Sequence, residues 1–277
     1  MNSFGHRLMA VLAILCTIVS TARADDPLAR LDADRYGPGT LIAAMEQLAT
    51  YRPPQAVDLL LPLLSHSEPD VARMAGWLLR KMGSAPAGLG AAGAVLADPQ
   101  AEPVSRRSAA LAVGELRDQG GISVLATALA NDADEGVRSM AAQALGDLFR
   151  PGAAAALSQA ARADESAEVR AAAVRALSQL PDADAQVVIS VLKDQDPMVR
   201  LEAAWALGQE SFRGSQGLLG NLQQAMQSDA DCRVQAAAAW ALGVIGDPSV
   251  KDALAAARNG PCRLTSQAAA WAQSVIK

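Results

Sequence analysis

The stretch Val199-Arg200-Leu-Glu-Ala-Ala-Trp-Ala-Leu207-Gly208 decides the fold, because copies of it return along the chain. Close copies begin at Val137, Val169 and Val234, and more degenerate ones begin at Val71, Ser105 and Thr265. Neighbouring copies begin 30–35 residues apart. Self-similarity at such a period is typical of a solenoid, in which each repeat packs only against its neighbours.

A second apolar segment precedes each copy, so every repeat is predicted to hold two helices. Leu218, Leu222 and Met226 are one example of its helical spacing, and no window alternates strongly enough to suggest a strand. Asp196-Pro197 and Asp247-Pro248 each place an N-cap residue before a proline at the first helical position. We therefore predict an all-α chain. Residues 25–52 should hold a linker and a capping helix, and residues 53–277 an α-solenoid of about seven helical hairpins.

The repeat resembles a known family. The segments Asp-Pro-Met-Val-Arg-Leu-Glu-Ala-Ala-Trp-Ala-Leu-Gly (196–208) and Ala-Leu-Gly-Val-Ile-Gly-Asp-Pro (241–248) resemble HEAT-like repeats of the phycobilisome-lyase type. The resemblance covers roughly residues 53–276 and implies a superhelical solenoid. It does not imply one function, because members of the family include chromophore lyases, hydroxylases and adaptor proteins.

Residues 1–24 have the pattern of a cleaved signal peptide. Arg7 precedes the short apolar run Leu8–Val19, and Ala22-Arg23-Ala24 fits the small-x-small cleavage rule. The apolar run is shorter than the roughly 20 residues that a membrane-spanning helix needs. A membrane anchor is the alternative interpretation. We expect cleavage after Ala24 and a mature protein that is periplasmic or secreted.

Cleavage would leave an acidic mature chain. Two of the 24 Lys and Arg residues lie in residues 1–24 and no acidic residue does, which leaves 22 basic residues against 29 acidic ones, a formal net charge of −7. Nonspecific nucleic-acid binding depends on neutralising phosphates, and anionic membranes attract basic segments. We therefore expect no nucleic-acid partner and no membrane insertion after cleavage.

Two cysteines, Cys232 and Cys262, remain after residues 1–24. They stand in matching phrases, Cys-Arg-Val and Cys-Arg-Leu, before the second helices of adjacent repeats. In an oxidising compartment this placement is typical of a disulfide, which here would join the sixth and seventh repeats. The alternative is a pair of small buried thiols.

Residues suited to catalysis are scarce. After cleavage His66 is the only histidine, whereas a His-based metal site needs two or three such ligands. No Gly-x-Ser-x-Gly nucleophile motif and no glycine-rich phosphate loop occur. Glycines such as Gly83, Gly114 and Gly146 recur singly with the repeat, which indicates a packing role. We expect no enzyme activity, no cofactor and no metal.

Arg138, Arg170 and Arg200 occupy one slot of the repeat and follow turns that carry aspartates. We interpret them as an internal structural ladder. Each guanidinium would tie carboxylates and carbonyls of its own turn and of the neighbouring one, a bidentate role that arginine suits. The family resemblance implies the same role. An exposed charged ladder for binding is the alternative.

All four tryptophans share another slot, six residues after the start of a copy: Trp77, Trp205, Trp240 and Trp271. On a helical wheel this slot lies nearly opposite the recurrent small and apolar positions. The resemblance implies that second helices line the concave surface, so three consecutive repeats should form an aromatic row there, with rungs about 10 Å apart. Alternatively, the neighbouring helix covers the slot and each indole is a wedge between repeats.

The face around this slot varies between repeats and is the candidate partner-binding surface. Its predicted members are Trp205, Trp240, Trp271, Glu202, Gln209, Arg175, Gln143 and Trp77. The leading hypothesis is a noncatalytic periplasmic scaffold or adaptor that grips a protein or an extended peptide, of open identity, on its concave face. The alternatives are a lyase-type chaperone that loads a cofactor and a sensor that binds a glycan or small molecule. The oligomeric state is left open.

Overall fold

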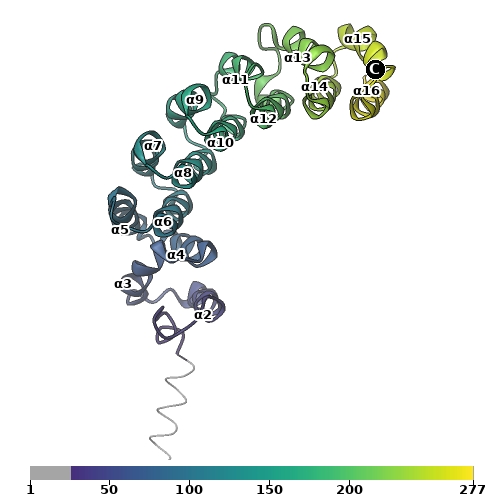
Figure 1. Ribbon diagram of the computed structural model, residues 1–277. Coiled ribbons are helices and arrows are strands. Elements are labelled where there is room, and N and C mark those ends of the chain that lie inside the picture. The colour runs from purple at the N-terminus through teal and green to yellow at the C-terminus, as the bar shows by residue number, and fades with distance from the viewer. Residues whose placement is uncertain (1–25, 277) are drawn as a thin grey trace, which may run out of the picture.

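The computed structural model describes residues 26–276, which form a curved array of helices (Figure 1). After α2 (Pro38–Tyr51), these residues fold into seven successive pairs. The first helices of the pairs are α3 (Ala56–Leu60) continued by the 3-10 helix η1 (Pro62–Ser65), α5 (Ala85–Ala97), α7 (Gly121–Asn131), α9 (Ala153–Ala163), α11 (Ala185–Val191), α13 (Leu218–Ser228) and α15 (Lys251–Arg258). The second helices are α4 (Pro69–Lys81), α6 (Pro103–Leu116), α8 (Glu135–Asp147), α10 (Ala167–Leu177), α12 (Pro197–Leu207), α14 (Cys232–Ile245) and α16 (Arg263–Val275). The predicted all-α solenoid of hairpins is confirmed.

The two members of the pairs form two layers. In Figure 1 the first helices lie on the outer, convex side of the arc, and the second helices lie on the inner, concave side. Each second helix packs against its own first helix and against the second helices before and after it, with α2 in contact with α4 at the N-terminal end. The concave wall is therefore a continuous layer of second helices, each packed against the next.

Small residues hold these inner helices close together. Near the C-terminal ends of their helices, Gly114, Gly146, Gly208 and Gly243 face the next second helix, and a Cβ added to any of them would lie 2.7–3.2 Å from its nearest neighbour. These glycines form what we call the glycine seam, in keeping with the packing role expected of them. Gly83 differs: its φ is +74° with nothing near its Cβ position, so it serves the turn after α4.

Aspartates begin many of the helices. Asp134, Asp196 and Asp231 are N-caps whose side chains accept hydrogen bonds from backbone N–H groups of the first turn. The predicted Asp196-Pro197 start of α12 is confirmed. Asp247 instead caps the 3-10 helix η3 (Pro248–Val250), and α15 begins only afterwards. Another short 3-10 helix, η2 (Glu210–Phe212), follows α12.

The predicted signal peptide and its cleavage point after Ala24 lie outside the described residues. Among residues 26–276, no helix combines the length and the apolar character needed to cross a membrane.

Candidate partner-binding face

Trp205, Trp240 and Trp271 form one continuous row across α12, α14 and α16. The ring centroids of Trp205 and Trp240 lie 4.3 Å apart with the planes tilted by 51°, and those of Trp240 and Trp271 lie 6.2 Å apart and nearly parallel, at 11°. The indoles thus reach toward one another and are closer than the expected rung spacing of about 10 Å. We call these three residues the tryptophan ladder.

The ladder is partly exposed and partly packed between repeats. Trp205 and Trp271 are each 40% exposed, and Trp240 between them is half-buried. Ring atoms of Trp240 and Trp271 lie 2.9 and 2.8 Å from the positions that a Cβ on Gly208 and Gly243 would take. These two indoles therefore rest on the glycine seam. Each is partly exposed, as the first interpretation of the slot expected, and partly packed between repeats, as the alternative expected.

The exposed side of the ladder belongs to the concave wall. On α12 the buried residues include Val199, Ala203 and Leu207, whereas Trp205 projects from the exposed side of the same helix. Since the second helices form the inner layer in Figure 1, that side faces the hollow of the arc.

Charged and polar residues border the ladder. Arg175 on α10 donates to the Glu202 carboxylate on α12 at 2.8 Å, and these side chains are 55% and 25% exposed. Gln209 is exposed just after α12. Gln143 is exposed too, but it lies on α8, which α10 separates from α12, so it does not border the ladder. Trp77 lies apart in the first repeat, because the second, third and fourth repeats carry other residues, among them the buried Leu111, in its slot.

A second ladder runs along the turns before the second helices. In each rung, Nε and Nη2 of an arginine donate to both carboxylate oxygens of an aspartate in the next repeat, and Nη1 donates to a backbone carbonyl of its own turn. For Arg170 the carboxylate is that of Asp194, at 2.7 and 2.8 Å, and the carbonyl is that of Asp164, at 2.9 Å. The rungs are Arg106–Asp132, Arg138–Asp164, Arg170–Asp194 and Arg200–Asp229.

This arginine ladder is internal. Arg106, Arg138 and Arg170 are buried, and their contacts link turns of the same chain. The sequence pattern did not predict the role of Arg106, because its copy of the repeat begins with Ser105 in place of valine. A binding role would need guanidinium groups that are free, and these already have carboxylate and carbonyl partners.

The electrostatics of the rungs favour the ionised pairs. Desolvation alone would raise the pKa of Asp194, but the hydrogen bonds from Arg170 and from the backbone N–H of Asp196 outweigh it and hold the pKa below its usual value. The pKa of Asp132 is likewise held below its usual value, because the hydrogen bonds from Arg106 and from the backbone outweigh the effect of burial. The hydrogen bond with Asp194 likewise raises the pKa of Arg170.

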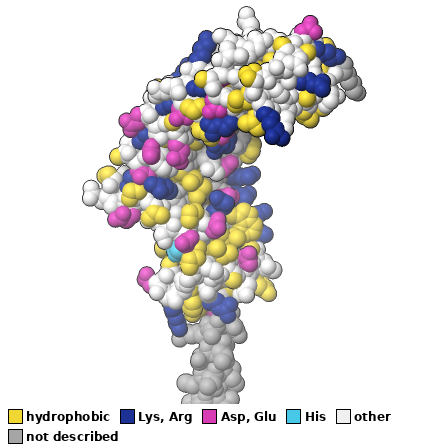
Figure 2. Space-filling model, turned by 45° about the vertical axis from the view of Figure 1, so that its right-hand side comes forward, with side chains coloured by type: hydrophobic (Ala, Val, Ile, Leu, Met, Phe, Trp, Pro, Cys, Tyr) yellow, Lys and Arg dark blue, Asp and Glu magenta, His cyan; other side chains and the backbone are white. Residues whose placement is uncertain are grey.

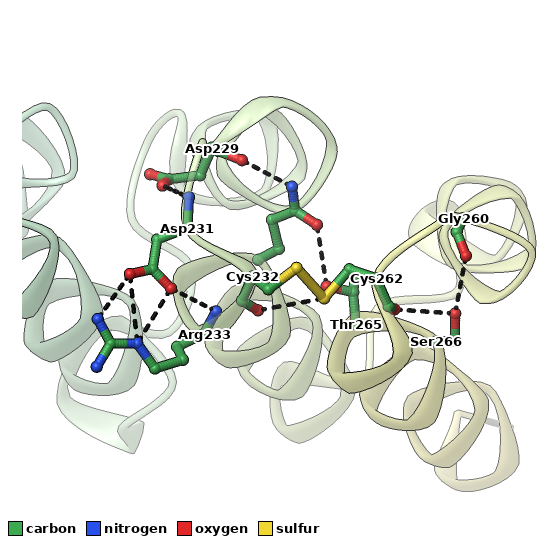
Figure 3. The surroundings of a disulfide bond; sticks show 9 residues. Asp229, Asp231, Cys232, Arg233, Gly260, Cys262, Thr265 and Ser266 are labelled. Carbon is green, nitrogen blue, oxygen red and sulfur yellow. Dashed lines mark hydrogen bonds and ion pairs between the residues drawn. A yellow bond between two sulfur atoms is a disulfide. The ribbon is translucent and has the colours of Figure 1, made fainter.

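The arginine ladder ends where a disulfide begins. Between the sixth and seventh repeats the arginine slot holds Gln235 and the aspartate slot holds Gly260. At this junction Cys232 and Cys262 are joined by a disulfide, with their Cα atoms 6.0 Å apart (Figure 3). That separation is within the ordinary range for disulfides. A covalent link thus takes the place of the ion pair.

Neutral hydrogen bonds accompany the disulfide. The side-chain amide of Gln235 donates to the Asp229 carbonyl at 2.7 Å and accepts from the Thr265 hydroxyl at 3.0 Å. These bonds keep α14 and α16 in register beside the Cys232–Cys262 bond (Figure 3). The last repeat, which carries Trp271, is therefore tied to the array differently from those before it.

The remaining candidate for chemistry is His66. Its Nδ1 accepts a hydrogen bond from the backbone N–H of Glu68 at 3.0 Å, in the turn between η1 and α4. Within residues 26–276, no three or more His, Cys, Asp and Glu side chains are grouped so that they could hold a metal ion.

Several solved structures are similar to this chain. Kap95p, in a structure with RanGDP, matches with 16% identity over 94% of this chain and 42% of its own, at a TM-score of 0.65. YibA of E. coli matches with 16% identity over 90% of this chain and 92% of its own, at 0.55. The CpcE–CpcF phycocyanin lyase complex of Nostoc matches with 23% identity over 78% and 85%, at 0.43. At these identities the likeness to Kap95p and YibA shows the fold alone.

A search of curated proteins finds no match. The family described as HEAT repeats, in contrast, matches residues 92–178 and 185–274, which together make up more than half of the chain. These two segments contain both ladders and the glycine seam. The protein is therefore a member of the HEAT-repeat family.

Proposed function

We propose that this HEAT-repeat protein is a noncatalytic scaffold or adaptor that binds a protein or an extended peptide on its concave wall, with the tryptophan ladder as the main anchor. The observation that carries this proposal is the exposure of neighbouring indoles, 40% for both Trp205 and Trp271, on one continuous inner surface. Tryptophan dominates many protein interfaces, because it offers a large apolar area together with an N–H donor.

The ladder is organised before any partner arrives. Trp240 contacts both other indoles, and it and Trp271 are seated on the glycine seam. Ordering a free side chain on binding costs about 0.5–1.5 kcal/mol, and side chains held in place in advance avoid much of that cost. The Arg175–Glu202 pair supplies a polar border of the kind that surrounds interface anchors.

The ring contacts favour a protein ligand over a glycan or a flat cofactor. Stacking on a sugar ring or a chromophore needs a free indole face. Trp240 is in ring contact with Trp205 on one side and with Trp271 on the other. The central indole is thus already in ring contact with both of its neighbours, so we favour protein side chains that pack against the ladder over a flat ligand that stacks on it.

Site-specific photo-crosslinking tests the proposal. A photoreactive residue at Gln209, exposed beside the ladder, should give an adduct of defined mass in cells, whereas the same residue at Gln227, exposed on the outer helix α13, should not. The Trp205→Ala, Trp240→Ala double variant should lose the adduct. Tyr51→Ala, which removes an aromatic ring that is 80% exposed on α2, should keep it. Equal adducts from Gln209 and Gln227 would contradict the proposal.

We also propose that the protein acts outside the cytoplasm, after cleavage at Ala24. The pattern of residues 1–24 supports export, and the Cys232–Cys262 disulfide suits an oxidising compartment. Intact-mass measurement of protein from the cell envelope should find a chain that begins at Asp25 and is two hydrogens lighter than its reduced form. A chain that retains residues 1–24 would refute the cleavage.

A further inference from the structure

A separate cavity lies at the other end of the protein from the tryptophan ladder. It has a volume of about 620 Å³ and is formed by α2, α4 and α6. Its apolar lining includes Ile42, Met74 and Trp77. Figure 2 shows the lower, N-terminal half of the molecule, where yellow hydrophobic side chains lie beside magenta and dark blue charged ones.

The apolar part of the cavity suits an aliphatic chain that ends in a cation. Trp77 and Met74 are half-buried, so part of each stays accessible. The indole of Trp77 already attracts one ammonium group, because Lys81 Nζ lies 5.7 Å from its ring centroid. This distance is within the range of about 6 Å in which cation–π attraction acts.

The charged part of the cavity is acidic. Glu46, Asp70 and Glu115 line it together with Arg73, whose guanidinium lies 3.9 Å from the Asp70 carboxylate. Lys81, beside the Trp77 ring, is a second cation near the cavity, so the carboxylates outnumber the cations by three to two. The carboxylates of Glu46 and Glu115 form no hydrogen bond or ion pair with any other residue of the described chain. Two carboxylates therefore face the cavity without a partner.

The arginine nearest to Glu115 does not pair with its carboxylate. The nearby Arg80 donates its Nε to the backbone carbonyl of Glu115, at 2.9 Å. Burial, and then the charge of Glu115, raise the pKa of Asp147 on α8, although Arg73 and Arg117 act in the opposite direction. Glu115 thus contributes negative potential at this end of the concave wall, against the opposing charges of Arg73 and Arg117.

We propose that this cavity receives a lysine or arginine side chain of the bound partner. The aliphatic part would lie against Met74 and Trp77, as long basic side chains do on apolar surfaces. The cationic head would lie between the Glu46 and Glu115 carboxylates and near the indole. The inference rests on the proposed function for the existence of a partner, and it gives that partner a basic residue.

Peptide titration of a single-tryptophan protein tests this directly. With Trp205, Trp240 and Trp271 changed to phenylalanine, the fluorescence of the described fold comes from Trp77. The probes are acetyl-Leu-Arg-Leu-amide and its citrulline counterpart, which has nearly the same shape without the charge. The arginine peptide should change the Trp77 emission saturably, at a half-saturation concentration at least tenfold below that of the citrulline peptide.

Charge variants sharpen the test. Glu46→Gln with Glu115→Gln should raise the half-saturation concentration about tenfold, the sum of two surface ion pairs that each lie within their usual range. Glu135→Gln with Glu168→Gln removes the same charge from exposed positions outside the cavity and should change it less than twofold. Equal binding of the two peptides, or equal effects of the two double variants, would overturn the proposal.

A second measurement guards against disruption by the three phenylalanines. In the otherwise unchanged protein, the response to the arginine peptide should disappear on Trp77→Phe, and its persistence would also overturn the proposal. In the single-tryptophan protein the readout comes from Trp77 alone, and the Gln209 crosslink does not involve this cavity. Failure of the cavity proposal is therefore distinguishable from failure of the proposed function.

Discussion

Replacing Arg170 by alanine removes a central rung of the arginine ladder. The side chains of Arg170 and Asp194 are 6% and 11% exposed, and the guanidinium donates to both carboxylate oxygens of Asp194 at 2.7 and 2.8 Å. It also donates to the carbonyls of Asp164 and Glu165, at 2.9 and 3.2 Å. The substitution would leave a carboxylate and two carbonyls without this donor in a turn that is mostly closed to water.

The expected loss of unfolding free energy is large for the truncation of a single buried side chain. Breaking a buried ion pair by removing one partner costs about 3–5 kcal/mol. Water can reach Asp194 once the guanidinium is gone, so we expect a loss near the lower end, about 3 kcal/mol of unfolding free energy. Because each repeat contacts only its neighbours, the two halves of the array should also unfold less cooperatively, with a smaller denaturant dependence.

Urea unfolding followed by far-ultraviolet circular dichroism measures both effects. Arg175→Ala is the matched control, because it removes an arginine and an ion pair from the same helix at an exposed site. Exposed pairs contribute about 0.2–1 kcal/mol. If Arg170→Ala and Arg175→Ala differ by less than about 1 kcal/mol, the ladder does not hold the repeats together in the way described.

Other substitutions test the seam, the disulfide and the acidic end. Gly243→Ala would place a Cβ 2.7 Å from Ala272 and should lower the unfolding free energy by about 1–3 kcal/mol. Gly90→Ala on α5, where no atom lies near the added Cβ, should not lower it, and equal urea midpoints for the two variants would contradict this. Changing Cys232 and Cys262 to alanine opens a loop of 30 residues and should cost about 2–4 kcal/mol. Hydrogen exchange should then rise in α15 and α16, and unchanged exchange would refute the role of the bond. Asp147→Asn should stabilise the protein at pH 7, because burial and Glu115 raise the folded-state pKa of Asp147 and the ionised form is penalised. That gain should shrink as the pH falls through the folded pKa toward the unfolded value and vanish below it; a gain that is constant with pH would argue against this origin.

Features that recur with the repeat were predictable from the sequence. The period of the Val-Arg phrase predicted paired helices, and the shared tryptophan slot predicted a row on neighbouring second helices. The same logic failed where one position departs from its register. Gly83 was grouped with the packing glycines, but it lies in a left-handed turn, and Arg106 was overlooked because Ser105 hides its copy of the repeat.

Features that depend on side-chain direction or on unique elements were not predictable. Whether an indole is exposed or wedged depends on how it leans over the previous helix, and Trp240 does so because Gly208 leaves room for its ring. The cavity at Trp77 was missed because one of its walls is α2, which is not a copy of the repeat. Helical spacing fixes the face of a residue but not its neighbour across a tertiary contact.

The glycine seam has a mechanical consequence for the array. On the inner side, helices such as α8 and α10 meet through Gly146 and Ala176 with no room for one added carbon. On the outer side, grooves of about 840 and 820 Å³ separate α5 from α7 and α7 from α9. The seam therefore leaves the inner helices no room to approach one another, so any tighter bending of the arc has to be absorbed by opening the outer grooves. A partner that binds the concave wall would therefore change the curvature of the array through the outer grooves. The line about which the repeats hinge would lie along the glycine seam, beneath the partner-binding surface.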